Sequence, residues 1–169
     1  CRFAGSSAVH RVKGANFALA NLFITQGVNP VFLINDFEVE TDRALNISFK
    51  LSIEYKTIFI DFDDTIIIDG KVNIEAIYLI YMAHNQNKAI ILITKHKGDL
   101  LFSLRRYKLE NLFTKVIHLQ QTENKVDYIK KLNYRESIFV DDSFSERLNV
   151  FNTLKIPVFS VDAIKSLFN

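Results

Sequence analysis

Residues 58–65, IFIDFDDT, decide the fold, because here an apolar run passes directly into three acids and a threonine. A short, continuous run of bulky apolar residues is typical of a strand that is buried on both faces of a sheet. Asp61, Asp63 and Asp64 then follow the predicted strand at its carboxyl end, the edge where open α/β sheets bind ligands. A hard cation such as Mg²⁺ would relieve the repulsion between such carboxylates. A polar loop after a strand explains the triplet equally well when it is taken alone.

A second apolar run ends in acids later in the chain. Residues 138–143 read IFVDDS, so Asp141 and Asp142 follow a predicted strand in the same way. In a doubly wound sheet the two strands can be neighbours, and their acids would then face Asp61 and Asp63 across the crevice. Two acid-tipped strands indicate a metal site much more strongly than one does.

Two further positions supply groups that a phosphate ester needs. Thr94 ends the apolar run 89–93, and Lys125 opens a predicted helix that follows the run 115–118. A helix cap or a surface charge is the ordinary explanation for either residue alone. Together they offer a hydrogen-bond donor and a cation to the oxygens of a phosphate.

The pattern from Tyr55 onward predicts an α/β fold with a doubly wound, Rossmann-like parallel sheet, because β-branched runs alternate with amphipathic stretches. The predicted strands are 57–60, 89–93, 115–118, 137–140 and 157–161, and the predicted helices are 74–86, 98–109, 123–132, 145–154 and 162–168. Asp69-Gly70 between apolar residues predicts a short β-hairpin flap. The short segment between Thr65 and Thr94 leaves no room for a large cap domain.

In order and placement, residues 56–169 resemble the haloacid dehalogenase-like (HAD) hydrolase superfamily, in its capless phosphatase type. The resemblance is carried by Asp61-x-Asp63-x-Thr65, Thr94, Lys125 and Asp141-Asp142, with Glu146 as a trailing acid. It implies that Thr94 and Lys125 bind the phosphoryl oxygens of a substrate.

The resemblance also implies a Mg²⁺-dependent phosphatase. Asp61 would be the nucleophile that forms an aspartyl-phosphate, and Asp63 would be the general acid and base. Asp61, the backbone carbonyl of Asp63 and one acid of the last motif would hold the metal, and we favour Asp142 over Asp141. The presence of Asp63 favours phosphoryl transfer over carbon–halogen chemistry. The alternatives are a catalytically weak binding or regulatory HAD-like module, and a phosphotransferase.

Residues 1–50 are predicted to be an amino-terminal extension to the phosphohydrolase domain at 55–169. The stretch 2–7, RFAGSS, followed by Gly14, resembles the carboxyl-terminal end of an ATP-grasp ligase over residues 1–30. Since the chain opens with Cys1 rather than Met, we expect a piece of a longer protein, and the resemblance implies that this is the carboxyl end of a ligase–phosphatase fusion. An extension that packs on the hydrolase core is the alternative. Within this segment we predict a helix at 16–26 and a strand at 30–35, followed by a polar, acidic stretch at 36–43.

Composition limits the remaining function classes. A net charge of +2 with no clustered basic face gives no footprint for nucleic acid. The single cysteine cannot form an internal disulfide, and no apolar run is long enough to span a bilayer, so we expect a cytoplasmic protein. The four histidines show no metal-ligand spacing, and no Ser/His/Asp arrangement is evident. The phosphorylated substrate is of unknown class, and the site should be open unless an ATP-grasp domain or an oligomer partner covers it.

Overall fold

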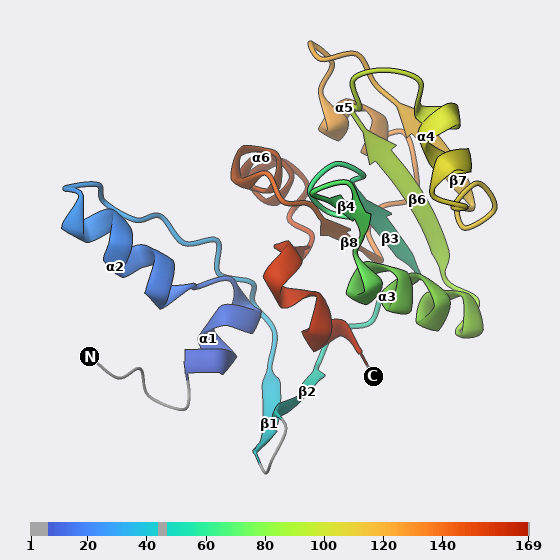
Figure 1. The fold of residues 1–169 in the computed structure, drawn as a ribbon. Helices are drawn as coiled ribbons and strands as arrows, with labels where there is room; N and C mark the ends of the chain where they lie inside the picture. Colours follow the sequence, from blue (N-terminus) through green and yellow to red (C-terminus); the bar gives the residue numbers. More distant parts are fainter. Residues whose placement is uncertain (1–6, 44–46, 169) are drawn as a thin grey trace.

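A sheet of five parallel strands lies at the centre of the part of the chain that the structure describes, residues 7–43 and 47–168 of a computed structural model (Figure 1). In sheet order the strands are β7 (Lys115–His118), β6 (Ala89–Thr94), β3 (Thr57–Ile60), β8 (Ser137–Val140) and β9 (Val158–Phe159). The predicted parallel sheet is confirmed, and β3, β7 and β8 have the predicted bounds.

The register of the sheet brings the ends of three strands together. Ile60 of β3 pairs with Leu92 of β6 on one side and with Val140 of β8 on the other. Since the strands are parallel, the residues that follow them emerge at one edge of the sheet. Asp61 and Asp141 therefore lie side by side, and the backbone N–H of Asp61 donates to the carbonyl of Val140 at 3.0 Å.

Helices cover both faces of this sheet, as predicted. They are α3 (Ile74–Asn85), α4 (Leu100–Arg106), α5 (Lys125–Ile129), α6 (Phe144–Leu154) and the 3₁₀ helix η1 (Val161–Leu167). Ile58 and Ile60 belong to a buried cluster with residues of α3, α4 and η1. Phe59, which points to the opposite face, belongs to a second cluster with residues of α5 and α6. The alternation of side chains along β3 thus forms two apolar layers.

The starts of four helices are fixed by side-chain caps. Asn73, Asp99, Asn124 and Ser143 each accept a hydrogen bond from a backbone N–H in the first turn of α3, α4, α5 and α6. Helices α4 and α5 lie within the helices predicted at 98–109 and 123–132, which were too long at both ends. Their starts were misplaced because α4 begins only after its cap Asp99 and α5 only after its cap Asn124.

The predicted hairpin flap follows β3. Strands β4 (Ile67–Ile68) and β5 (Lys71–Val72) pair antiparallel across a turn in which Asp69 and Gly70 have φ of 49° and 70°. A tight two-residue turn of type I′ requires positive φ at both of its central residues. Ile66 and Ile67 are buried in the core, so this hairpin is packed inward at its base.

The amino-terminal segment holds two helices and a second hairpin. They are α1 (Ser7–Lys13), α2 (Phe17–Thr25), and the antiparallel pair β1 (Val39–Arg43) and β2 (Ile47–Leu51). Helix α2 confirms the prediction at 16–26, whereas α1 was not foreseen.

One prediction for this segment was wrong, because residues 30–35 form no strand. Strand β1 lies in the polar, acidic stretch 36–43, where no strand was predicted. The apolar run 30–35 takes no ladder partner, and its last residue, Asn35, bonds to the sheet through its side chain instead. Strand β1 is stabilised by its partner β2 rather than by burial, which its alternating charges could not indicate. The Arg-Phe-x-Gly-Ser stretch of the ATP-grasp resemblance lies in residues 1–6, outside the described residues.

The segment is attached to the edge of the sheet at β9. Asn35, 1% exposed, donates to the carbonyl of Val158 at 2.8 Å and accepts from its N–H at 3.0 Å. Phe37 stacks on Phe159 with ring centroids 5.9 Å apart. At Gly14, with φ of 113°, an added Cβ would lie 1.8 Å from the carbonyl oxygen of Leu33, so only glycine lets the chain return this closely.

Among the described residues, no helix has the length and apolar character needed to cross a membrane.

Asn35→Ala should lower the free energy of unfolding by about 1–3 kcal/mol, because it leaves the N–H and the carbonyl of Val158 without partners in a buried place. Urea denaturation measures the change. Asn152→Ala, at an exposed position of α6, is the control and should stay within about 0.5 kcal/mol of wild type. Equal effects of the two substitutions would contradict the anchoring role of Asn35.

Candidate functional site

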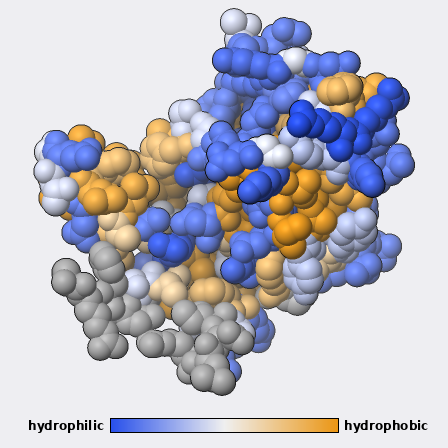
Figure 2. Space-filling view, viewed as in Figure 1, coloured by the Kyte–Doolittle hydropathy of each residue, from blue (hydrophilic) through white to orange (hydrophobic). Residues whose placement is uncertain are grey.

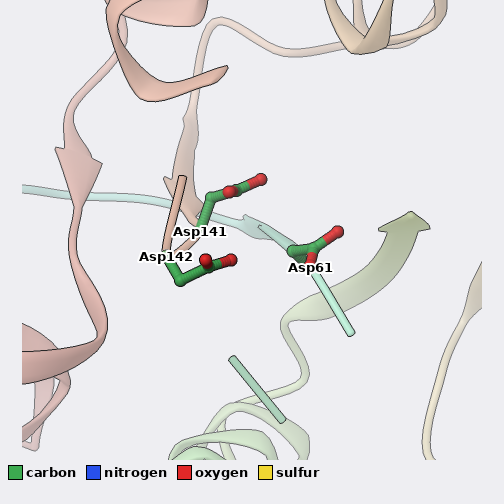
Figure 3. A group of neighbouring side chains, drawn as sticks. All are labelled: Asp61, Asp141 and Asp142. Atoms are coloured by element: carbon green, nitrogen blue, oxygen red, sulfur yellow. The ribbon is translucent and has the colours of Figure 1, made fainter. Parts of the chain in front are cut away.

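Three carboxylates meet at the carboxyl edge of the sheet. Figure 3 shows Asp61 at the end of β3 beside Asp141 and Asp142 at the end of β8. Each offers one oxygen, and these oxygens all lie within 4.8 Å of one another. Asp61 and Asp141 are buried and Asp142 is exposed, so the group is open to solvent on one side only.

A buried lysine bridges the two buried acids. Lys125, 3% exposed and the first residue of α5, places its Nζ 2.5 Å from Asp61 Oδ1 and 2.7 Å from Asp141 Oδ2. Burial alone would lower the pKa of Lys125, but the two carboxylates outweigh burial and hold this pKa above its ordinary value. The ammonium is therefore charged at neutral pH and ties β3, β8 and α5 together.

The buried acids titrate in an unusual range. Burial raises the pKa of Asp61 to about 7, since Lys125 offsets only part of the desolvation and Asp141 adds repulsion. Burial likewise raises the pKa of Asp141, against the opposing effect of Lys125. A carboxyl that is poised near neutral pH inside a crevice is typical of functional sites.

Asp141 and Asp142 differ in what their oxygens already bind. Asp141 Oδ2 takes the Lys125 ammonium, and its Oδ1 accepts the backbone N–H of Ser143 at 2.8 Å. The side chain of Asp142 has a single hydrogen bond with another described residue, a long one of 3.4 Å from the Thr65 hydroxyl to Oδ1. Asp142 is therefore the acid of this pair whose oxygens are free for a further ligand.

The loop that carries these acids is held from two directions. The Thr65 hydroxyl accepts the backbone N–H of Asp142 at 3.0 Å, which fastens the loop after β8 to the loop after β3. The Arg147 guanidinium donates to the carbonyls of Asp141 and Asp142 at 2.6 Å each, and burial lowers its pKa. Glu146, the trailing acid, does not reach the acid group, because it pairs with Lys95 at 2.6 Å.

Thr94 ends β6 at the same edge of the sheet. It is 1% exposed, and its hydroxyl is the buried side-chain polar atom that finds no hydrogen-bond partner among the described residues. Such an orphaned hydroxyl is costly unless a ligand or water completes it. Thr94 is thus suited to bind a group that enters the crevice.

The Asp63 side chain lies outside the acid group. It is 51% exposed and accepts the Nδ1 of His96 at 2.9 Å to each of its oxygens. On its other side, His96 Nε2 lies 3.0 Å from the Ser103 hydroxyl, and the His96 carbonyl accepts from His118. The hydrogen bonds from His96 to Asp63 and to Ser103 were not foreseen from the sequence. No local sequence spacing could reveal this series of hydrogen bonds, because Asp63, His96 and Ser103 come from separate segments of the sequence.

The residues present fit a hard divalent cation. Asp61 and Asp142 supply free carboxylate oxygens at one spot, with Asp141 beside them, and hard cations prefer oxygen ligands. The three acids outnumber the single ammonium of Lys125, so the group carries excess negative charge whenever Asp61 is ionised.

Comparison with known proteins adds nothing that identifies the site. No protein-family model matches the sequence, and no curated protein matches it.

The raised pKa of Asp61 has a consequence for stability in metal-free protein. The folded pKa of about 7 lies above the ordinary value of 3.8, so the folded state holds the proton more tightly. This contribution to the free energy of unfolding is present at low pH and is lost as pH rises towards 7. Between about pH 5.5 and pH 8.5, wild type should lose roughly 2 kcal/mol more stability than Asp61→Asn, which cannot titrate.

Urea denaturation in EDTA at both pH values measures this difference. Asp127→Asn, at an exposed position of α5, is the matched control and should follow wild type. If the wild type and Asp61→Asn lose stability in parallel, the pKa of Asp61 is not raised.

Proposed function

We propose that this chain is a Mg²⁺-dependent phosphomonoesterase of the HAD-like type that works through an aspartyl-phosphate on Asp61. The observation that carries the proposal is the pairing of buried Lys125 with Asp61 and Asp141, at the sheet edge where Thr94 also offers a hydroxyl with no partner among the described residues. A nucleophilic carboxylate, a buried cation and a free donor within one crevice are what phosphoryl transfer requires.

Asp61 is suited to attack a phosphorus atom. Lys125 occupies its Oδ1, and Oδ2 makes no hydrogen bond with another described residue. An attack by Oδ2 forms the Asp61–phosphorus bond and breaks the bond from phosphorus to the ester oxygen. Lys125 and Thr94 bind the phosphoryl oxygens. Asp61 and Asp142 would hold Mg²⁺, which would supply positive charge to offset that of the phosphoryl group.

Asp63 is the residue that moves protons. As a carboxylic acid it gives its proton to the leaving oxygen in the first step, and as a carboxylate it takes a proton from the water that attacks phosphorus in the second. That second attack breaks the Asp61–phosphorus bond and releases inorganic phosphate. The bond from His96 keeps Asp63 outside the buried acid group, where solvent reaches it.

A catalytically weak binding module and a phosphotransferase remain the alternatives. The first keeps the same site without turnover, and the second differs only in the acceptor for the phosphoryl group. Release of phosphate from p-nitrophenyl phosphate in the presence of Mg²⁺ separates an active phosphatase from the binding module.

Asp61→Asn should reduce this phosphate release by at least about 100-fold, because the amide is nearly isosteric but a poor nucleophile. Asp127→Asn is the charge-matched control and should keep wild-type turnover. Ser103→Ala should also stay within a few-fold of wild type. Loss of activity with Ser103→Ala and not with Asp61→Asn would assign the nucleophile to the Asp63–His96–Ser103 chain instead.

Asp142→Asn should weaken Mg²⁺ binding by about tenfold or more, and by more than Asp141→Asn does, since both oxygens of Asp141 are already engaged. The Mg²⁺ concentration that gives half of the maximal rise in Tm measures this binding without substrate. Asp69→Asn, in the turn of the hairpin flap, is the control and should leave it unchanged. A larger effect of Asp141→Asn would reverse the choice of ligand.

A further inference from the structure

A large groove lies between the amino-terminal segment and the α/β unit. Its volume is about 920 Å³, and one wall is formed by α2 and residues 28–32. The apolar side chains of this wall include Leu19, Ala20, Phe23, Val28, Val31 and Phe32. Figure 2 shows apolar residues gathered over α2, at the left of the view. Most of these apolar side chains are exposed to solvent, and an exposed apolar patch of this kind is typical of a binding surface.

The groove reaches the candidate site at one end. Asp142 lines it and also belongs to the acid group with Asp61 and Asp141. Asp64, which follows Asp63 and has a φ of 53°, lines the same end. A molecule whose phosphate sits among Asp61, Lys125 and Asp142 therefore has the groove as the space next to it.

The charges of the groove restrict what can fill it. Asp64, Glu75, Asp142 and Asp162 line the groove, and two of them are ion-paired, Glu75 with Lys165 and Asp162 with Arg11. The single cation among the lining residues, Arg147, donates from Nη1 to two carbonyls. The four acids still outnumber these three cations, which disfavours a ligand with further negative charge, such as a nucleotide or a sugar bisphosphate. An uncharged apolar group would instead bury surface against Leu19 and Phe23.

The size of the groove fits a small molecule. Ligand pockets commonly enclose about 300–1,000 Å³ and are mostly apolar with a few placed polar groups. We propose that this groove binds the organic part of the substrate, which is then a phosphomonoester of an apolar, otherwise uncharged alcohol. The identity of the phosphate end rests on the proposed function, whereas the apolar end rests on the groove alone.

Binding of alkylphosphonates tests the groove without turnover. Phosphonates keep the phosphate-like head, and their carbon–phosphorus bond is not a substrate for ester hydrolysis. In excess Mg²⁺, calorimetry should show that octylphosphonate binds wild type at least about 30-fold more tightly than ethylphosphonate, because each buried methylene strengthens binding by up to a few-fold. Methyl octanoate, which lacks the anionic head, should bind more weakly than octylphosphonate.

Two leucines of α2 make a matched pair of variants. Leu19 lines the groove, whereas Leu22 lies on the same helix outside it, and both are exposed, at 46% and 60%. Leu19→Ala should weaken octylphosphonate binding by about fivefold or more and leave ethylphosphonate binding unchanged. Leu22→Ala should leave both unchanged, with circular dichroism as the check on folding.

The proposal is overturned if ethyl and octyl compounds bind wild type within about threefold of each other, or if Leu19→Ala and Leu22→Ala behave alike. A flat alkyl series is also the result expected if a protein surface occupies the groove instead. Failure of the proposed function is a separate outcome: the alkyl series then keeps its slope while no phosphate ester is hydrolysed.

Discussion

The Lys125 ammonium between Asp61 and Asp141 is the interaction on which the rest of the site depends. Three charges buried at a sheet edge are unfavourable unless each is paired, and removal of one partner of such a group costs about 3–5 kcal/mol. The ion pairs form only when the ends of β3 and β8 lie side by side and the start of α5 places Lys125 between them. The Asn124 cap fixes the first turn of α5 and thereby helps to place Lys125 between the two acids.

The same ion group explains why the side chains of Asp141 and Asp142 differ in their contacts. Asp141 is saturated by Lys125 and by the N–H of Ser143, so it supports the lysine and the loop. Asp142 is lifted out of the buried layer, with its backbone N–H held by the Thr65 hydroxyl and its carbonyl by Arg147. The backbone is thus fixed on both sides while the carboxylate stays available.

Sequence reasoning succeeded where burial dictates residue type. Strands such as β8 must be apolar throughout, and the acids that end them are conspicuous for that reason, so the sheet and its polar edge could be predicted. It failed for His96, whose partners come from the turn after β3 and from α4, a juxtaposition that no local pattern records. It also failed at β1, since a strand that is stabilised by cross-strand pairing on the surface needs no apolar face. The ligand preference of Asp142 over Asp141, and the resemblance behind it, stay predictions.

The amino-terminal segment and the acid group are connected through β9, a strand of only two residues. Asn35 binds Val158, and Phe37 stacks on Phe159. The carbonyl of Phe159 in turn accepts the backbone N–H of Asp141 at 3.2 Å. The groove wall is therefore anchored to the strand that also supports a member of the buried ion group. Since the hairpin flap is too small to enclose a ligand, an extension anchored in this way can supply the apolar surface that the sheet edge, occupied by charges, does not offer.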